Sequence, residues 1–309
     1  MSVRVLFASD AIADEFEAPL QAALQAAGIS ADLVRQADPA TVDYIIYAPS
    51  SPLQDFAPYV RVKAVLSVWA GVERIVGNAT RTQPLCRMVE DGLTEGMVEY
   101  VTGHVLRHHL GMDRHIVNPL QVWDPVCPPL ARERVVAMLG MGELGTACAR
   151  ALMGLNFQVV GWSRTEKSVP GMRCLAGEAG LQQALRLADF VVTLLPKTPE
   201  TEGLLDARRL AWLKRGAVIL NPGRGALIDD DALLAALDEG RISHATLDVF
   251  RIEPLPPEHP FWRHPNVTVT PHVAADTRAD GAARVLAENI RRGEAGEAFL
   301  HLVDRALGY

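Results

Sequence analysis

The chain has 309 residues, 49% hydrophobic and 22% charged, a composition typical of a soluble globular protein of roughly two domains. Its net charge is −7 and its basic residues form no stripe, so we expect neither nucleic acid nor a membrane surface as a partner. No apolar run approaches the ~20 residues of a membrane span, and the N-terminal apolar run is too short for a signal peptide. The four cysteines lack C-x-x-C spacing, which favours reduced thiols in a cytoplasmic protein.

The first part of the chain alternates short apolar strands with a helical pattern, which predicts a small α/β unit of the flavodoxin-like kind. The helical pattern covers residues 13–27 and ends at Gly28. A longer helix is predicted over residues 94–115, with Thr94 as its N-cap. The strands are predicted over residues 3–8, 32–34, 44–48 and 64–68.

From residue 135 onward the alternation predicts a doubly wound parallel (Rossmann) sheet of six strands. A final helix over residues 278–292 leads back to the first unit. The smaller, substrate domain is therefore expected to be discontinuous, with residues 1–100 plus 280–309, and the dinucleotide-binding domain to span residues 101–279. The six strands are predicted over residues 135–139, 158–161, 189–195, 217–221, 245–248 and 267–270, with helices over 146–153, 181–187, 206–213 and 230–239.

A glycine-rich turn follows the strand over residues 135–139. It reads Gly140-Met141-Gly142-Glu143-Leu144-Gly145, a G-x-G-x-x-G, and leads into a helix expected to be capped by Gly154. The first glycine permits a tight turn, the second lets backbone approach phosphate, and the third lets helix pack on strand. The helix N-terminus adds free N–H groups and a positive dipole end. This context predicts a dinucleotide site, against the alternative of a ligand-free turn.

Three side chains suited to catalysis follow later strands of the same sheet. Arg224 comes after Asn221-Pro222-Gly223, Glu253 lies five residues beyond Asp248, and His272 follows the last strand. Each alone has an ordinary explanation as a solvated or turn residue. Because ligands bind beyond the C-terminal ends of parallel strands, their convergence on the rim that holds the glycine loop favours an active site.

These segments resemble the D-isomer-specific 2-hydroxyacid dehydrogenases over nearly the full length of the chain. The resemblance rests on G-M-G-E-L-G, N-P-G-R-G-A-L-I-D, D-V-F…E-P-L-P and T-P-H-V-A, in the family's order and spacing. The A-G-V turn, W-S-R and the tail V-D-R…G-Y are most similar to the glyoxylate/hydroxypyruvate reductases of the A type. The resemblance implies that Arg224, Glu253 and His272 are catalytic and that the nicotinamide lies beside Asp248.

The chemistry of 2-keto acid reduction suits these roles. His272 as imidazolium can protonate the keto oxygen, since the ordinary histidine pKa of ~6.5 lies near working pH. Glu253 would fix the imidazole tautomer, and Arg224 would bind the substrate's carboxylate and carbonyl oxygens. The substrate pocket is expected to include Tyr47, Trp69 and the backbone of Ala70 and Gly71, besides Arg224 and His272. Trp69 stands where these relatives usually have a small residue, which leaves the size of the pocket open. The family resemblance favours glyoxylate and hydroxypyruvate as substrates, with phenylpyruvate-like acids as the alternative.

The end of the second Rossmann strand predicts NADPH in preference to NADH. Ser163 stands where many relatives place Asp, and Arg164 follows, where it can pair with a 2′-phosphate. The residues expected to contact the cofactor are Gly140, Met141, Gly142, Glu143, Leu144, Gly145, Trp162, Ser163, Arg164, Lys167, Leu195, Pro196, Asn221, Pro222, Gly223, Asp248, His272 and Ala274.

Two further predictions concern the helix over residues 94–115. His104 and His108 have zinc-ligand spacing, but no third ligand is evident, so no metal is expected. The apolar side with Met97, Val101 and Val105 is either core or a dimer face, and the family resemblance favours a homodimer. His244, just before a predicted strand, is expected on the opposite rim. A non-enzymatic dinucleotide-sensing protein, like the family's corepressors, is the alternative to an enzyme.

Overall fold

The computed structural model describes residues 2–308, which form two compact units. Unit 1 comprises the residues up to Leu93 together with those from Asp276 onward, and unit 2 spans Thr94–Ala275. These limits lie a few residues from the boundaries predicted from the sequence. Tyr309, the last residue of the tail that contributed to the resemblance, lies outside the described residues.

Unit 1 is built on a parallel five-stranded sheet in the order β2-β1-β3-β4-β5. This is the flavodoxin-like order, which confirms the predicted class of the smaller domain. The segment after the last helix returns to the sheet edge, where Val303 N donates to Leu85 O at 2.8 Å. The strands are β1 (Val3–Phe7), β2 (Ala31–Val34), β3 (Tyr44–Tyr47), β4 (Ala64–Ser67) and β5 (Leu85–Cys86).

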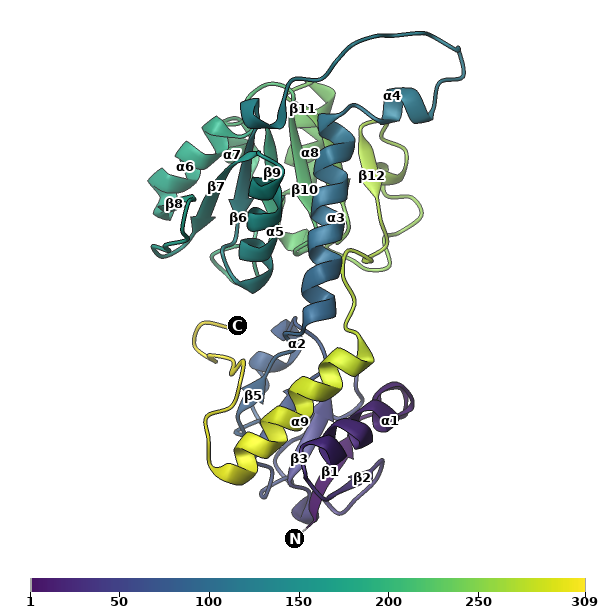
Figure 1. The fold of residues 1–309 in the computed structure, drawn as a ribbon, viewed down its shortest axis with the longest axis vertical. Coiled ribbons are helices and arrows are strands. Elements are labelled where there is room, and N and C mark those ends of the chain that lie inside the picture. Colours follow the sequence, from purple (N-terminus) through teal and green to yellow (C-terminus); the bar gives the residue numbers. More distant parts are fainter. Residues whose placement is uncertain (1, 309) are drawn as a thin grey trace. The chain divides into compact units, whose positions relative to one another are not determined.

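Two long helices, α1 (Asp10–Ala26) and α9 (Ala279–Ala295), lie side by side on one face of this sheet (Figure 1). Helix α1 begins where the Ser9 hydroxyl accepts a hydrogen bond from Ile12 N, as an N-cap does. Its apolar residues recur every three or four positions and enter the core against the equivalent stripe of α9. The other face is covered by loops and the short helix α2 (Glu73–Val76). The 3-10 helix η1 (Pro39–Thr41) precedes β3 and has no buried residue.

Unit 2 is built on a parallel seven-stranded sheet in the order β12-β11-β10-β9-β6-β7-β8. Counted from β6, this is the doubly wound Rossmann order with one added strand, so the predicted fold class is confirmed. The prediction of six strands missed the edge strand β8, a four-residue segment that pairs only with β7. The strands are β6 (Val135–Leu139), β7 (Gln158–Ser163), β8 (Arg173–Ala176), β9 (Phe190–Thr193), β10 (Ala217–Asn221), β11 (Ile242–Leu247) and β12 (Val267–Val269).

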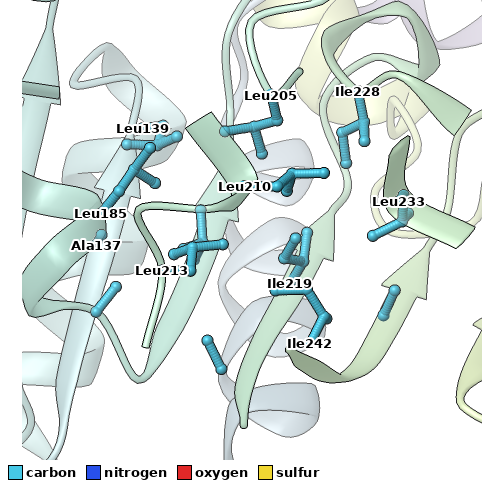
Figure 2. Packing of buried hydrophobic residues seen from close by; sticks show 14 of the residues in the cluster. Ala137, Leu139, Leu185, Leu205, Leu210, Leu213, Ile219, Ile228, Leu233 and Ile242 are labelled. Carbon is cyan, nitrogen blue, oxygen red and sulfur yellow. The ribbon is translucent and has the colours of Figure 1, made fainter. Parts of the chain in front are cut away.

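Helices cover both faces of the unit 2 sheet and create two apolar cores. Figure 2 shows the core under α6 (Gly177–Leu187), α7 (Ala207–Leu210) and α8 (Asp230–Asp238), where Leu185, Leu210 and Leu233 meet the sheet. The opposite core lies under α3 (Asp91–His109) and α5 (Glu143–Gly154). The remaining short helices are α4 (Asp113–Ile116), η2 (Ala131–Glu133), η3 (Gly225–Leu227) and η4 (Pro260–Trp262).

Several predicted helix boundaries are wrong, for local reasons. Helix α3 begins at Asp91 rather than Thr94, because the Glu90 carboxylate accepts from the N–H groups of Gly92 and Leu93. It ends at His109 rather than near residue 115, and Gly111 follows with a φ of 62°. Gly154 lies inside α5, and Asn156, at a φ of 69°, supplies the left-handed turn after it.

Candidate active site

The glycine-rich turn connects β6 to α5. At two of its positions, close contacts with the backbone leave no room for a side chain. Gly140 has a φ of 112°, and a Cβ there would overlap the Leu194 carbonyl oxygen after β9. A Cβ on Gly145 would overlap the carbonyl oxygen of Gly140. The turn after β6 therefore lies against the segment that follows the neighbouring strand β9. This is the point where the order of strands in the sheet reverses. In doubly wound sheets, that reversal is where ligands bind.

Gly142 differs from the other two because it faces open space. It is exposed, and a Cβ built on it meets no atom within 4 Å. Gly142 is also the N-cap of α5, and no side chain caps that helix end. Free N–H groups beside a position without a side chain suit a pyrophosphate, so these residues fit a bound dinucleotide. Glu143 is exposed and Leu144 half-buried in the first turn of α5, whereas Met141 is buried with its sulfur against Gly161.

The predicted cofactor residues after β7 fall into two groups. The Trp162 side chain is buried and its indole N–H donates to Gly177 O at 2.9 Å, so only its backbone is left to meet a ligand. The Ser163 hydroxyl donates to Thr165 O at 2.6 Å, which uses its proton within the turn. Arg164 and Lys167 are exposed, and Lys167 lines a shallow cavity of about 450 Å³ with Cys174 and the first turns of α6.

Leu195 and Pro196, also predicted to contact the cofactor, follow β9 and are half-buried.

Asn221, at the end of β10, shapes the loop that carries Arg224. Its buried side-chain oxygen accepts from the Thr193 hydroxyl at 2.6 Å and from Gly223 N at 3.2 Å. Its side-chain N–H donates to Arg224 O at 2.9 Å. A Cβ on Gly223 would lie 2.7 Å from Thr193 O, so the loop lies close against the neighbouring strand end. This network holds Arg224, which is half-buried, at the C-terminal rim of the sheet.

Glu253 and His272 lie in hydrogen-bond contact on the same rim. The His272 Nδ1 atom lies 2.9 Å from Glu253 Oε2, and the other carboxylate oxygen accepts from Phe250 N at 2.9 Å. The Glu253 carboxylate is thus oriented by its own loop and points at one nitrogen of the imidazole. About half of the His272 side chain, 53%, is exposed, which leaves the ring accessible to a small molecule.

Asp248 organises the loop that carries His272. Its carboxylate is fully buried and accepts hydrogen bonds from the Thr270 hydroxyl, Val273 N and Ala274 N. Its carbonyl oxygen accepts from His272 N at 2.9 Å, and His272 has a φ of 56°. These contacts assign the Asp248 carboxylate to the loop; its contact with a nicotinamide stays a prediction.

The loops of Arg224 and Glu253 are joined by Arg251, which was not predicted from the sequence. The Arg251 guanidinium donates to Ile228 O at 2.7 Å and to Ala226 O at 3.4 Å, both in the turn after Arg224. It also lies 3.5 Å from a Glu202 carboxylate oxygen. The sequence offered one signal, an arginine inside the D-V-F…E-P segment, but a loop arginine is ordinarily a solvated charge.

The predicted substrate residues of unit 1 follow the ends of β3 and β4. Trp69 is 43% exposed, and the half-buried Ala70 and Gly71 come directly after it. Tyr47 is a correction: its side chain is 1% exposed and packs edge-on against Phe56 in the core of unit 1, 5.6 Å between ring centroids. Because Tyr47 lies at the end of a fully buried strand, its ring belongs to the core rather than to a pocket.

The histidines of α3 pack against the sheet. His108 Nε2 lies 2.8 Å from the Thr246 hydroxyl, and its ring lies 4.6 Å from that of His244. His244 lies inside β11 rather than before it, so the predicted start of that strand is wrong. Within residues 2–308, no group of three or more His, Cys, Asp or Glu side chains is arranged to hold a metal ion.

The apolar side of α3 is core rather than a dimer face. Met97, Val101 and Val105 are buried against the sheet of unit 2. Exposed apolar side chains lie instead in the segment after α3, among them Ile116, Val117, Leu120, Val122, Trp123 and Val126. In the part of the chain that the structure describes, no helix has both the length and the apolar character needed to cross a membrane.

Comparison with known proteins agrees with this geometry. Residues 105–274 match the family described as D-isomer specific 2-hydroxyacid dehydrogenase, NAD binding domain. The chain is 38% identical over 281 residues to glyoxylate/hydroxypyruvate reductase A of Serratia proteamaculans, covering 88% of this chain and 89% of that protein. A D-isomer specific 2-hydroxyacid dehydrogenase from Xanthobacter autotrophicus Py2, solved with NADPH and MES, is 38% identical, with a TM-score of 0.91 and full coverage of both chains. An NADPH-dependent glyoxylate/hydroxypyruvate reductase from Sinorhizobium meliloti, solved with NADP and sulfate, is 33% identical, with a TM-score of 0.88 and full coverage of both chains.

The doubly wound sheet and the match to an NAD binding domain family place the chain among the nicotinamide-dependent oxidoreductases. The chain belongs to the D-isomer-specific 2-hydroxyacid dehydrogenase family, and the predicted family is thereby confirmed.

Proposed function

We propose that the enzyme uses NADPH to reduce short 2-keto acids, glyoxylate to glycolate and hydroxypyruvate to D-glycerate, in the cytoplasm. The observation that carries the proposal is the 2.9 Å contact between His272 and Glu253 on the rim that also holds Arg224. The names of relatives in Serratia proteamaculans and Yersinia enterocolitica, both glyoxylate/hydroxypyruvate reductase A, support these substrates.

His272 supplies the proton in this scheme. The bound cofactor provides the hydride that reaches C2 of the keto acid. Because Nδ1 of His272 faces Glu253, Nε2 is the ring atom that gives its proton to the keto oxygen, producing the hydroxyl group. Glu253 holds the imidazole in the required tautomer and stabilises the charged ring before the transfer.

Arg224 and the turn after β4 would bind the substrate. The planar guanidinium of Arg224 suits bidentate contact with the 2-keto acid and polarises its carbonyl group. Backbone N–H groups at Ala70 and Gly71 would hold the carboxylate. The family resemblance supports this arrangement for the unit 1 turn.

The preference for NADPH rests on the turn after β7. Arg164 and Lys167 are exposed there, and no acidic residue stands at the Ser163 position. Solved relatives from Xanthobacter autotrophicus Py2 and Sinorhizobium meliloti hold NADPH or NADP. Arg164 would pair with the 2′-phosphate that NADH lacks.

A homodimer completes the proposal. Trp123 is 92% exposed and Leu120 is 82% exposed in the segment after α3. Large apolar side chains gathered on one segment mark an interaction surface, and the family resemblance favours a second copy as its occupant. A charged residue in place of Leu120 should convert the dimer to a monomer, measured by analytical ultracentrifugation.

One observation favours a second candidate. The exposed indole of Trp69 is able to stack on an aromatic substrate, which would favour phenylpyruvate. Steady-state assays with NADPH separate the possibilities. We expect kcat/KM for glyoxylate and hydroxypyruvate to exceed that for phenylpyruvate. The reverse order would support the second candidate, and cofactor binding without turnover of any 2-keto acid would support a sensing protein.

A further inference from the structure

Helix α3 reaches the loop of His272 through a directed chain of hydrogen bonds. The Tyr100 hydroxyl lies 2.7 Å from the Thr270 hydroxyl, which donates to Asp248 Oδ1 at 2.6 Å. A carboxylate accepts hydrogen bonds and cannot donate them when ionised, so the Thr270 proton points to Asp248. Tyr100 must then be the donor to Thr270. The direction of the chain is therefore Tyr100 to Thr270 to Asp248.

Asp248 in turn accepts hydrogen bonds from three consecutive backbone amides. Its two carboxylate oxygens accept from Val273 N and Ala274 N, each at 2.9 Å, and its carbonyl oxygen accepts from His272 N. The first of these three residues is strained, since His272 has a φ of 56°. A residue with a Cβ stays in that region only where its surroundings hold it there.

We propose that Tyr100 is a positioning residue for the reaction at His272, acting through Thr270 and Asp248 on the turn that aims the imidazole. The inference rests on the proposed function for its catalytic consequence. Neither Tyr100 nor Thr270 touches the reacting atoms; both set where the proton donor stands. A hydrogen bond that begins on a helix and ends at a catalytic loop transfers the rigidity of the helix to the loop.

The environment of Tyr100 suits a permanent donor. Burial raises the pKa of its hydroxyl, so the proton stays on the phenol throughout the working pH range. Its ring packs against that of His104, one turn along α3, with 4.5 Å between centroids. The ring contact with His104 and the hydrogen bond to Thr270 therefore both hold the Tyr100 hydroxyl in place.

Two substitutions each remove one hydroxyl group from this chain of hydrogen bonds, and two others serve as controls. Thr270→Val replaces the hydroxyl by a methyl group of similar size, and Tyr100→Phe removes only the phenolic oxygen. Thr270→Ser keeps the hydroxyl and is the conservative rescue. Tyr44→Phe in unit 1 is the matched control, because its hydroxyl donates to Glu294 Oε1 at 2.8 Å in a structural contact.

We expect Thr270→Val to lower kcat about 10- to 100-fold through misplacement of His272, and Tyr100→Phe to lower it roughly 3- to 10-fold. The Kd for NADPH should change less than kcat in both, since the glycine turn, which would hold the pyrophosphate, is not part of this hydrogen-bond chain. Thr270→Ser should retain kcat near that of the wild type. Tyr44→Phe should lower the melting temperature and leave kcat unchanged.

Hydrogen exchange tests the same chain without any substrate. The amides of His272, Val273 and Ala274 should exchange at least about tenfold faster in Thr270→Val, faster to a lesser degree in Tyr100→Phe, and as in wild type in Thr270→Ser. Wild-type exchange at these amides in both Tyr100→Phe and Thr270→Val would overturn the inference, as would wild-type kcat in both. If the wild-type enzyme reduces no 2-keto acid, the proposed function fails, and the exchange rates still decide whether Tyr100 positions the loop.

Discussion

Gly225 lies directly against the main chain of Phe250, so closely that a Cβ on the glycine would overlap the Phe250 carbonyl group. Gly225 follows Arg224, and Phe250 N donates to Glu253, so this contact brings together the two loops that carry these proposed catalytic residues. The contact requires glycine and cannot be relieved by rotation of a side chain, because the overlapping atoms belong to the backbone.

We therefore expect Gly225→Ala to separate the two loops. Overpacking of this kind costs about 1–3 kcal/mol of unfolding free energy, and displacement of Arg224 should lower kcat/KM roughly 100-fold. The matched control is Gly154→Ala, which places a methyl group in open space on α5 and should leave kcat/KM unchanged. Chemical denaturation and steady-state kinetics of both variants make the comparison. Wild-type kcat/KM in Gly225→Ala would contradict the role given to this contact.

The cofactor preference is tested at the turn after β7. Loss of a charged hydrogen bond worth ~1.5–3 kcal/mol means that Arg164→Ala should weaken NADPH binding roughly 10- to 100-fold, with little effect on NADH. Ser163→Asp should oppose the 2′-phosphate and give NADH an acceptor for its ribose hydroxyl. Arg150→Ala, an exposed arginine on α5, serves as the control. If Arg164→Ala weakened the binding of NADPH and of NADH equally, the predicted role of Arg164 at the 2′-phosphate would be wrong.

Substrate size is tested at Trp69. If its exposed indole narrows the pocket, Trp69→Gly should raise kcat/KM for phenylpyruvate relative to glyoxylate by about tenfold. Trp262→Ala, at a half-exposed tryptophan in unit 2, should leave that ratio unchanged. A fall in the ratio in Trp69→Gly would instead indicate stacking of Trp69 on the larger substrate. The measurement is kcat/KM for both acids in the three proteins.

The paired histidines of α3 and β11, His108 and His244, predict that the protein becomes less stable as the pH falls. Burial and the neighbouring imidazole lower the pKa of His108 to about 3, and burial and Arg107 lower that of His244 to about 4. In the unfolded chain both take up protons near the ordinary pKa of ~6.5, so the unfolded state binds more protons below that pH. The free energy of unfolding should therefore decrease as pH falls from about 6.5 toward about 4.

His244→Gln should make this decrease shallower, because one of the two lowered groups is gone. The control is His115→Gln, at an exposed residue of α4. Melting temperatures across that pH range provide the measurement. An identical slope in His244→Gln and the wild type would rule out this pair as a source of acid sensitivity.

The parts of the fold that the sequence predicted well are those with strong local signals. The strand Val135–Leu139 and the glycine turn after it carry their own pattern of apolar run, turn and helix. The catalytic candidates could be grouped because parallel strands end on one rim. Short elements such as β8 and β5 gave no periodic signal, and they form only through pairing with a neighbouring strand.

The missed contacts depend on distant segments of the chain. Tyr100 and Thr270 lie 170 positions apart and meet only once α3 packs on the sheet. Arg251 binds carbonyl oxygens of residues 226 and 228, which no local pattern indicates. Tyr47 was expected in a pocket because it ends a strand, yet its neighbours on that strand are all buried, and its ring follows them into the core.

The most direct test of the proposed reaction compares NADPH oxidation by the wild-type enzyme and by His272→Gln, with glyoxylate and with hydroxypyruvate. We predict turnover by the wild type and a kcat roughly 10²- to 10⁴-fold lower in the variant, with the Kd for NADPH nearly unchanged. Wild-type turnover in His272→Gln would contradict the assignment of His272 as the proton donor, and no turnover of either acid by the wild type would contradict the proposed function.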